Sequence, residues 1–206
     1  PRANQIHLSP NDDLQAALDG SNYGDEFVLA NGRYTGSASL SWGPNMLISR
    51  YTHGGTITIR ALNYGKAVLD GQNMMRIIIV KAPIVLEGLD LVNGSADARW
   101  GGNGGAVFVD GSSVAIIRNC NMYQNEAKFS GIAGENWNGG SGGAVFVSYD
   151  AHATLIDCEI YFNTAVSMMI YGWGEPEYMD EESIESFVSN GGCGGCLRGG
   201  AFYVDG

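Results

Sequence analysis

An acidic segment near the C-terminal end of the chain is the densest group of potential metal ligands. Carboxylates and backbone carbonyls are the ligands that Ca²⁺ prefers, so we expect Glu177, Asp180 and Glu181 to be the candidates for a calcium site. The segment has no EF-hand loop, and a solvated acidic loop with a short helix near 179–188 accounts for the same residues. We therefore expect no obligatory cofactor, with Ca²⁺ as the one ion that the sequence allows. The whole cluster comprises Glu175, Glu177, Asp180, Glu181, Glu182 and Glu185.

The cysteines form two pairs of different character. Cys193 and Cys196 make a CxxC sequence between glycine pairs, but a zinc site needs two further ligands, and none is spaced nearby. A local disulfide or two free thiols are the alternatives there. Cys120 and Cys158 occupy equivalent positions in the repeat described below, where they could form a disulfide or pack inward as small hydrophobic side chains. An even number of cysteines is compatible with an oxidising compartment.

Residues that could act as general acids or bases are scattered along the chain. A polysaccharide lyase needs a base beside a group that neutralises a uronate, and a glycoside hydrolase needs two carboxyl groups near each other. The one adjacent aspartate pair, Asp12 and Asp13, stands before an expected helix and is assigned to its start. We therefore expect no catalytic constellation. The residues weighed are Lys81, Arg118, Lys128, Asp70, Asp90, Asp110, Asp157, His7, His53 and His152.

The sequence Asn93-Gly94-Ser95 matches an N-glycosylation sequon, which in a secreted protein would carry a glycan at Asn93. A simple turn explains the same three residues. With the even cysteine count, this favours an extracellular or cell-surface location.

Composition narrows the classes of function. The chain has 206 residues, 45% of them hydrophobic, with 31 glycines, 5 prolines and a net charge of −11. Abundant glycine with little proline, spread among β-branched residues, indicates many tight turns between short strands. The negative charge repels nucleic acids and anionic membranes but suits a neutral glycan or a protein partner. No apolar run approaches the ~20 residues of a transmembrane helix.

The N-terminal part predicts a helix and the remainder predicts strands. Polar residues at 11–13 offer an N-cap, Leu14, Ala17 and Leu18 follow helical spacing, and Gly20 supplies a stop. We expect a helix over 13–19 that precedes the first strand and covers the end of a core. From Thr56 onward, short β-branched runs follow each other without helical periodicity, so these strands must pair with segments distant in sequence.

A repeat shows which segments pair. Gly104-Gly105-Ala106-Val107-Phe108-Val109 recurs 38 residues later as Gly142-Gly143-Ala144-Val145-Phe146-Val147, and Cys120, Tyr123, Asn125 and Ala127 recur at the same offset. A weaker copy lies 31 residues earlier, and a third GGA begins at Gly199. This predicts a right-handed parallel β-helix solenoid over 1–206, a single domain, with GGA-type repeats over 104–206. Asn125 and Asn163 should stack as an asparagine ladder.

The segments between each Asn-x-Ala end and the next GGA vary in length, so long loops should leave the stack at one corner. Trp100, Trp137 and Trp173 each lie in such a segment. We expect them on one face, where aromatic rings could stack on sugars or anchor a protein. Each could instead fold back over its own loop.

The motif pair GGAVFV…YQNEA and GGAVFV…YFNTA resembles the GGA and FxxN repeats of polymorphic outer membrane proteins, without the strict FxxN spacing. The run LQAALDGSNYGDEFVLANGRYTG resembles the first coil of pectin-lyase-like β-helix proteins. This resemblance implies the fold more strongly than the activity, because the fold hosts lyases, hydrolases, adhesins and structural proteins.

Two functions follow as hypotheses. The first is a non-enzymatic scaffold, adhesion-type protein or assembly subunit that binds a protein partner or glycan through its looped face. The second is a polysaccharide lyase or hydrolase. Because the final GGAFYVDG mirrors the start of an earlier repeat, we also expect the C-terminal end to continue in a longer parent or to be covered by a partner.

Overall fold

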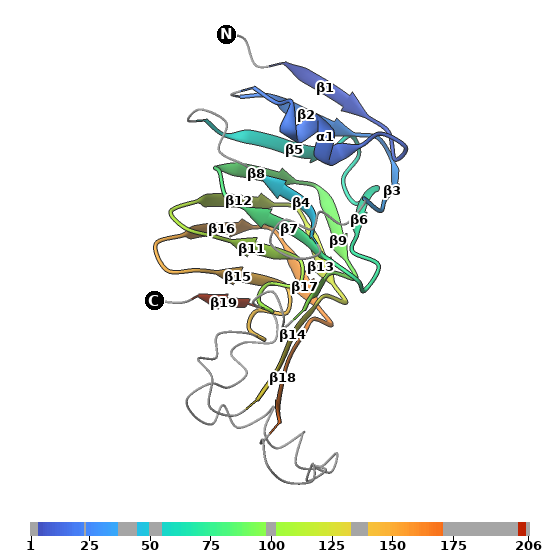
Figure 1. Ribbon diagram of the computed structural model, residues 1–206. Coiled ribbons are helices and arrows are strands. Elements are labelled where there is room, and N and C mark those ends of the chain that lie inside the picture. The colour runs from blue at the N-terminus through green and yellow to red at the C-terminus, as the bar shows by residue number, and fades with distance from the viewer. Residues whose placement is uncertain are drawn as a thin grey trace.

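The computed structural model describes residues 4–22, 24–36, 45–49, 55–97, 102–132, 140–170 and 202–204. Within them the regular secondary structure is mostly β-strand, arranged as four sheets (Figure 1). Sheet A contains β1 (Gln5–Leu8), β2 (Glu26–Leu29), β5 (Ile57–Ala61), β8 (Ile84–Glu87), β12 (Val114–Arg118) and β16 (His152–Ile156). Sheet B contains β3 (Gly32–Tyr34), β6 (Ala67–Asp70), β9 (Leu89–Val92), β13 (Asn121–Tyr123) and β17 (Glu159–Tyr161). Sheet C contains β4 (Asn45–Ser49), β7 (Arg76–Val80), β11 (Val107–Val109), β15 (Val145–Val147) and β19 (Phe202–Val204). Sheet D contains β10 (Ser95–Ala96), β14 (Glu126–Ile132) and β18 (Thr164–Ile170).

The order in which the chain visits these sheets is cyclic. From β2 onward, successive strands enter sheet A, then B, then C, and from β8 onward a strand of sheet D comes between those of B and C. Each strand pairs in parallel with the strand that occupies the same place one cycle earlier. The all-β, all-parallel character expected from the repeat is confirmed.

Strand register also confirms the spacing of the repeat. Val107 lies opposite Val145 and Ala127 opposite Ala165, at the offset of 38 that also separates Asn125 from Asn163. Ala96 lies opposite Ala127, the weaker copy, and Val145 lies opposite Phe202, the third GGA copy. The segments of variable length all connect sheet D to sheet C, so they begin and end at equivalent places in each cycle.

The expected helix is α1 (Leu14–Asp19), and the Asp13 carboxylate caps it by accepting from the Ala16 amide. Its position differs from the expectation, because β1 precedes it. The short run before Ser9 gives little local signal, and it becomes a strand only by pairing with β2. Buried Leu14 and Leu18 join the core, so the helix covers the end of the stack beside β4 in place of a strand.

Gln15 makes the bond that joins the helix to the sheet. Its side-chain Oε1 accepts from the Ile48 amide at 2.7 Å, and its Nε2 donates to the Ile48 carbonyl at 3.2 Å. The side-chain amide of Gln15 thus takes the place of a peptide group from a neighbouring strand at the outer edge of β4, the last strand of sheet C. An edge that would otherwise expose unpaired groups is satisfied locally.

Replacing Gln15 by Ala should lower the free energy of unfolding by about 1.5 kcal/mol, because it leaves both groups of Ile48 without this partner in a partly buried place. Chemical denaturation monitored by circular dichroism measures the change. Asn11→Ala is the control, because Asn11 is exposed and lies outside the helix. This variant should change the free energy of unfolding by less than about 0.5 kcal/mol. Equal losses in the two variants would contradict the role assigned to Gln15.

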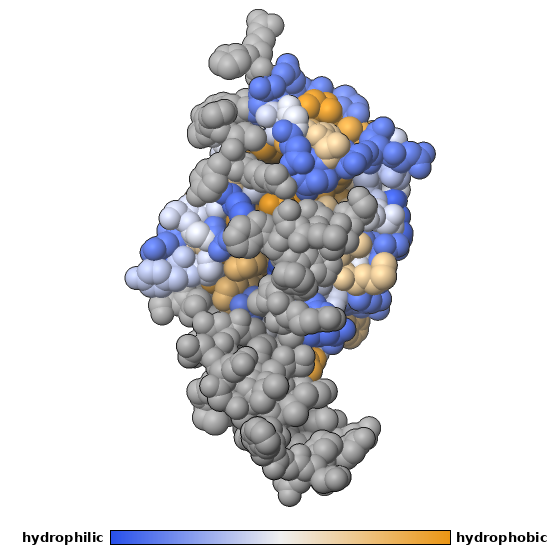
Figure 2. All heavy atoms as spheres, viewed as in Figure 1, coloured by the Kyte–Doolittle hydropathy of each residue, from blue (hydrophilic) through white to orange (hydrophobic). Residues whose placement is uncertain are grey.

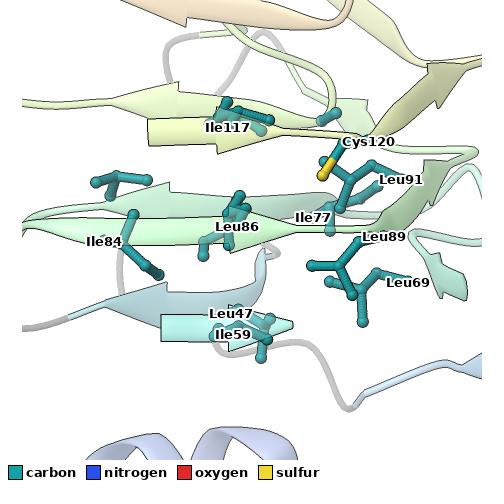
Figure 3. Close-up of a cluster of buried hydrophobic side chains, with 14 of the residues drawn as sticks. Leu47, Ile59, Leu69, Ile77, Ile84, Leu86, Leu89, Leu91, Ile117 and Cys120 are labelled. Carbon is teal, nitrogen blue, oxygen red and sulfur yellow. The ribbon is translucent and has the colours of Figure 1, made fainter. Parts of the chain in front are cut away.

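The core lies between the sheets and is built from inward side chains at alternate strand positions. Figure 3 shows Ile59, Leu86 and Ile117, which lie opposite one another in successive cycles, stacked in this interior. Strands β4 and β7 are buried along their whole length, as in parallel sheets covered on both faces. In the parts of the chain that the structure describes, no helix has the length and apolar character needed to span a membrane.

Candidate functional site

Most residues predicted from the loops lie outside the described part of the chain. Their assignments stay predictions: a binding role for Trp100, Trp137 and Trp173, Ca²⁺ ligation by Glu177, Asp180 and Glu181, and a disulfide between Cys193 and Cys196. The strand positions next to these loops are described. On sheet C, Phe108 and Phe146 stand outside the core cluster and pack edge to face, with ring centroids 5.4 Å apart.

Arg76 lies at the start of the buried strand β7 and is only 2% exposed. Its guanidinium donates to the carbonyls of Asn103 and Gly104 and to Asn45 Oδ1, at 2.7 to 3.0 Å. It also lies 5.1 Å from the centre of the Phe108 ring. Burial lowers the pKa of Arg76 to about 10, partly offset by Asp110, so the group remains a cation at neutral pH. Its partners are neutral oxygens, which suits a structural tie between β7 and the chain before β11.

Cys120 and Cys158 take equivalent places in neighbouring strands, as the repeat predicted. Both are free thiols in the structure, with Cys120 buried in the core and Cys158 partly buried against it. The Cys120 sulfur donates to the Arg118 carbonyl at 3.3 Å. Burial raises the pKa of Cys120 to about 12, so its thiol stays protonated and is a poor nucleophile at neutral pH.

Asn93, the sequon asparagine, occupies a turn with a φ of 52°. Its side-chain nitrogen donates to Asp70 Oδ1 at 2.9 Å, and Ser95 of the same sequon is buried. The nitrogen that would carry a glycan is therefore engaged within the fold, as the turn alternative requires. Glycosylation itself stays a prediction.

Asp70 is the buried acceptor at this turn. Burial pushes its pKa upward, but hydrogen bonds from Asn93, the Gln72 amide and Arg33 outweigh this effect and hold the pKa below the usual 3.8. A carboxyl group whose pKa is depressed by folding contributes stability above its unfolded pKa and loses that contribution as pH falls through the folded value.

Asp70→Asn should therefore reduce the decrease in the free energy of unfolding that acidification causes. Relative to the wild type, the variant should be less stable at neutral pH and should lose less stability between about pH 5 and about pH 2. Glu26 and Glu87, whose pKa values are also lowered, remain in both proteins, so the difference isolates Asp70. Parallel stability curves across that range would show that Asp70 is not the source.

The basic residues considered for catalysis each lie in an ion pair. Lys81 contacts Asp110 at 3.1 Å, Arg118 contacts Glu87 at 2.8 Å, and Lys128 contacts Glu126 at 2.7 Å. Among the residues that the structure describes, no group of three His, Cys, Asp or Glu side chains is placed to hold a metal. These contacts do not form a centre with a free base beside a pair of acids.

The described surface with the richest binding chemistry is the outer face of sheet B, called here the sheet B face. Side chains at alternate positions form two rows across the strands. One row carries Asp90, Asn121 and Glu159, in register, and Asn121 Nδ2 donates to Asp90 Oδ1 at 2.8 Å. The second row ends in Tyr123 and Tyr161, whose rings stack 5.0 Å apart and 5° from parallel.

Phe162 extends the second row at the turn that follows β17. Its ring meets Tyr161 at 5.5 Å and 81°, which makes an aromatic corner. Tyr161 is 40% exposed and Phe162 is 80% exposed, whereas the described surface seen in Figure 2 is mostly hydrophilic, with hydrophobic residues exposed in small areas. Analysis of the sequence missed this site. The recurrence of Tyr123 as Tyr161 was its only visible sign, because the contribution of Phe162 depends on the turn.

Comparison with known proteins supplies no relative. No protein-family model, no curated protein and no solved structure matches the chain.

Proposed function

We propose that this chain is a right-handed parallel β-helix that serves as a non-enzymatic binding scaffold, of the adhesion or assembly-subunit type, outside the cell or at its surface. The cyclic order of the parallel sheets and the constant register between cycles support the solenoid. Such a stack presents rows of like side chains on a rigid surface, which suits binding to an extended ligand.

The observation that carries the binding role is the sheet B face, where exposed aromatic rings stand beside a row of carboxylates and an amide. Tyr and Phe supply rigid apolar contact area, and the neighbouring oxygens and nitrogens supply directional hydrogen bonds. The basic groups that a lyase would use are tied in ion pairs, which supports binding over catalysis.

A second surface that suits a binding role is the edge formed by β16 and β17. These strands are the last in sheets A and B within the described residues. Leu155 and Ile160 are only partly buried there, whereas Ile117 and Met122, one cycle earlier, are fully buried. A protein partner that adds strands to this edge would complete the burial of these side chains.

A paired measurement on the whole chain tests the scaffold against the enzyme. We expect retention on at least one immobilised polysaccharide or protein, and no release of reducing ends from pectins, alginates or neutral glucans during long incubation with and without Ca²⁺. Release of oligosaccharide would establish the polysaccharide lyase or hydrolase instead.

A further inference from the structure

Phe162 occupies a backbone conformation that suits it poorly. Its φ is 53°, in the left-handed region, where an aromatic residue is a conformational outlier. The turns one and two cycles earlier place Gln124 and Asn93 in the same region, with φ values of 56° and 52°. Polar residues, especially Asn, adopt this conformation at lower cost, so the turn itself does not call for an aromatic side chain.

Burial does not compensate for this cost. Phe162 is 80% exposed and is absent from the hydrophobic core, and its described ring contact is with Tyr161 alone. A strained and exposed aromatic side chain contributes little to folding stability. The physical argument therefore points to a role at the surface of the folded protein.

The charges of the sheet B face select the class of ligand. Asp90 and Glu159 bring negative charge to the row beside the tyrosines. Arg33, in the same row, has its guanidinium in contact with Asp70. A polyuronate or sulfated glycan would be repelled by this face, whereas the hydroxyl groups of a neutral sugar can donate to carboxylates.

We propose that the corner made by Tyr161 and Phe162 binds an uncharged oligosaccharide, with the apolar face of a sugar ring against Phe162 and its hydroxyl groups directed to Glu159 and Asn121. This inference rests on the proposed scaffold function and names its ligand class. Rows that repeat at the strand spacing of about 4.8 Å also present similar groups along an extended chain of sugars.

Phe162→Asn separates binding from stability, because it introduces the residue type that occupies the equivalent turn position at Asn93. Affinity of the whole chain for neutral polysaccharides, such as a β-glucan, a xylan and a mannan, is measured by isothermal titration and by retardation in gels containing the polymer. The wild type should bind at least one of them, and Phe162→Asn should weaken that binding about tenfold or more. The same variant should melt at an equal or higher temperature, since strain and an exposed apolar ring are removed.

Val114→Thr is the matched control, since Val114 is a 38% exposed apolar residue on sheet A; it should leave affinity unchanged. Unweakened binding by Phe162→Asn, or wild-type binding to polygalacturonate as tight as to the neutral polymers, would overturn the proposal. So would failure to bind any neutral polymer, while the scaffold function would still stand if a protein partner were retained. Release of reducing ends would reject the scaffold function separately.

Discussion

Gly105→Ala should cost about 4 kcal/mol of folding stability and leave little folded protein at physiological temperature. A Cβ atom on Gly105 would lie 2.6 Å from the Glu126 amide nitrogen and 2.7 Å from the Glu126 carbonyl oxygen, with the Gly143 carbonyl closer still. All three obstacles are backbone, which is held by the pairing between cycles and cannot yield as a side chain does. Urea denaturation, or the soluble yield if the variant does not fold, measures the effect.

Gly111→Ala is the control for this prediction. Its φ of 60° imposes the conformational cost of a left-handed residue, but nothing lies within 4 Å of the added methyl group. We expect a loss of about 1 kcal/mol. If the two variants were equally stable, backbone conformation alone would explain the glycines, and the close approach at Gly105 would have no energetic importance.

The same reasoning explains the GGA motif. Its first glycine, Gly104 or Gly142, has a φ of 65° or 63°. In the first copy the second glycine, Gly105, fits against backbone from the neighbouring cycle. The alanine of both copies is fully buried. The motif thus marks where the chain enters sheet C.

Asn125→Ala should destabilise the protein by about 3 kcal/mol, because several buried groups lose their partners together. Asn125 is 1% exposed. Its Oδ1 accepts from the Gly94 amide at 2.8 Å, and its Nδ2 donates to the Leu91 carbonyl at 3.0 Å and to Asn163 Oδ1 at 2.9 Å. The side chain thus joins three consecutive cycles, and thermal or chemical unfolding measures its loss.

Gln124→Ala provides the comparison, since Gln124 is the exposed residue in the same turn with a similar φ of 56°. Its replacement should change stability by less than about 0.5 kcal/mol. A loss at Asn125 no larger than that at Gln124 would contradict the importance of the asparagine ladder.

Much of the fold could be predicted because the residues that specify strand pairing recur at a constant spacing along the chain. The recurrence of Cys120, Asn125 and Ala127 fixed the register between cycles, since one-residue slips would turn inward residues outward. Asp13 and the spacing of Leu14 and Leu18 identified the helix from local chemistry alone. The asparagine ladder was predicted for the same reason, because equal residues at equal places must stack in parallel pairing.

The chain's sequence by itself therefore determined the repeat, the helix, the equivalent places of Cys120 and Cys158 and the part of each cycle where the chain varies in length. Only the tertiary structure decided that β1 precedes the helix, that Gln15 closes the edge of β4 and that Arg76 is buried among carbonyls. It also decided that Tyr161 and Phe162 form an exposed corner. Each of these depends on groups that are distant in sequence or on a left-handed turn, and no local pattern specifies either. Periodicity encodes how neighbouring cycles pair, whereas the surface they create follows from their assembly in space.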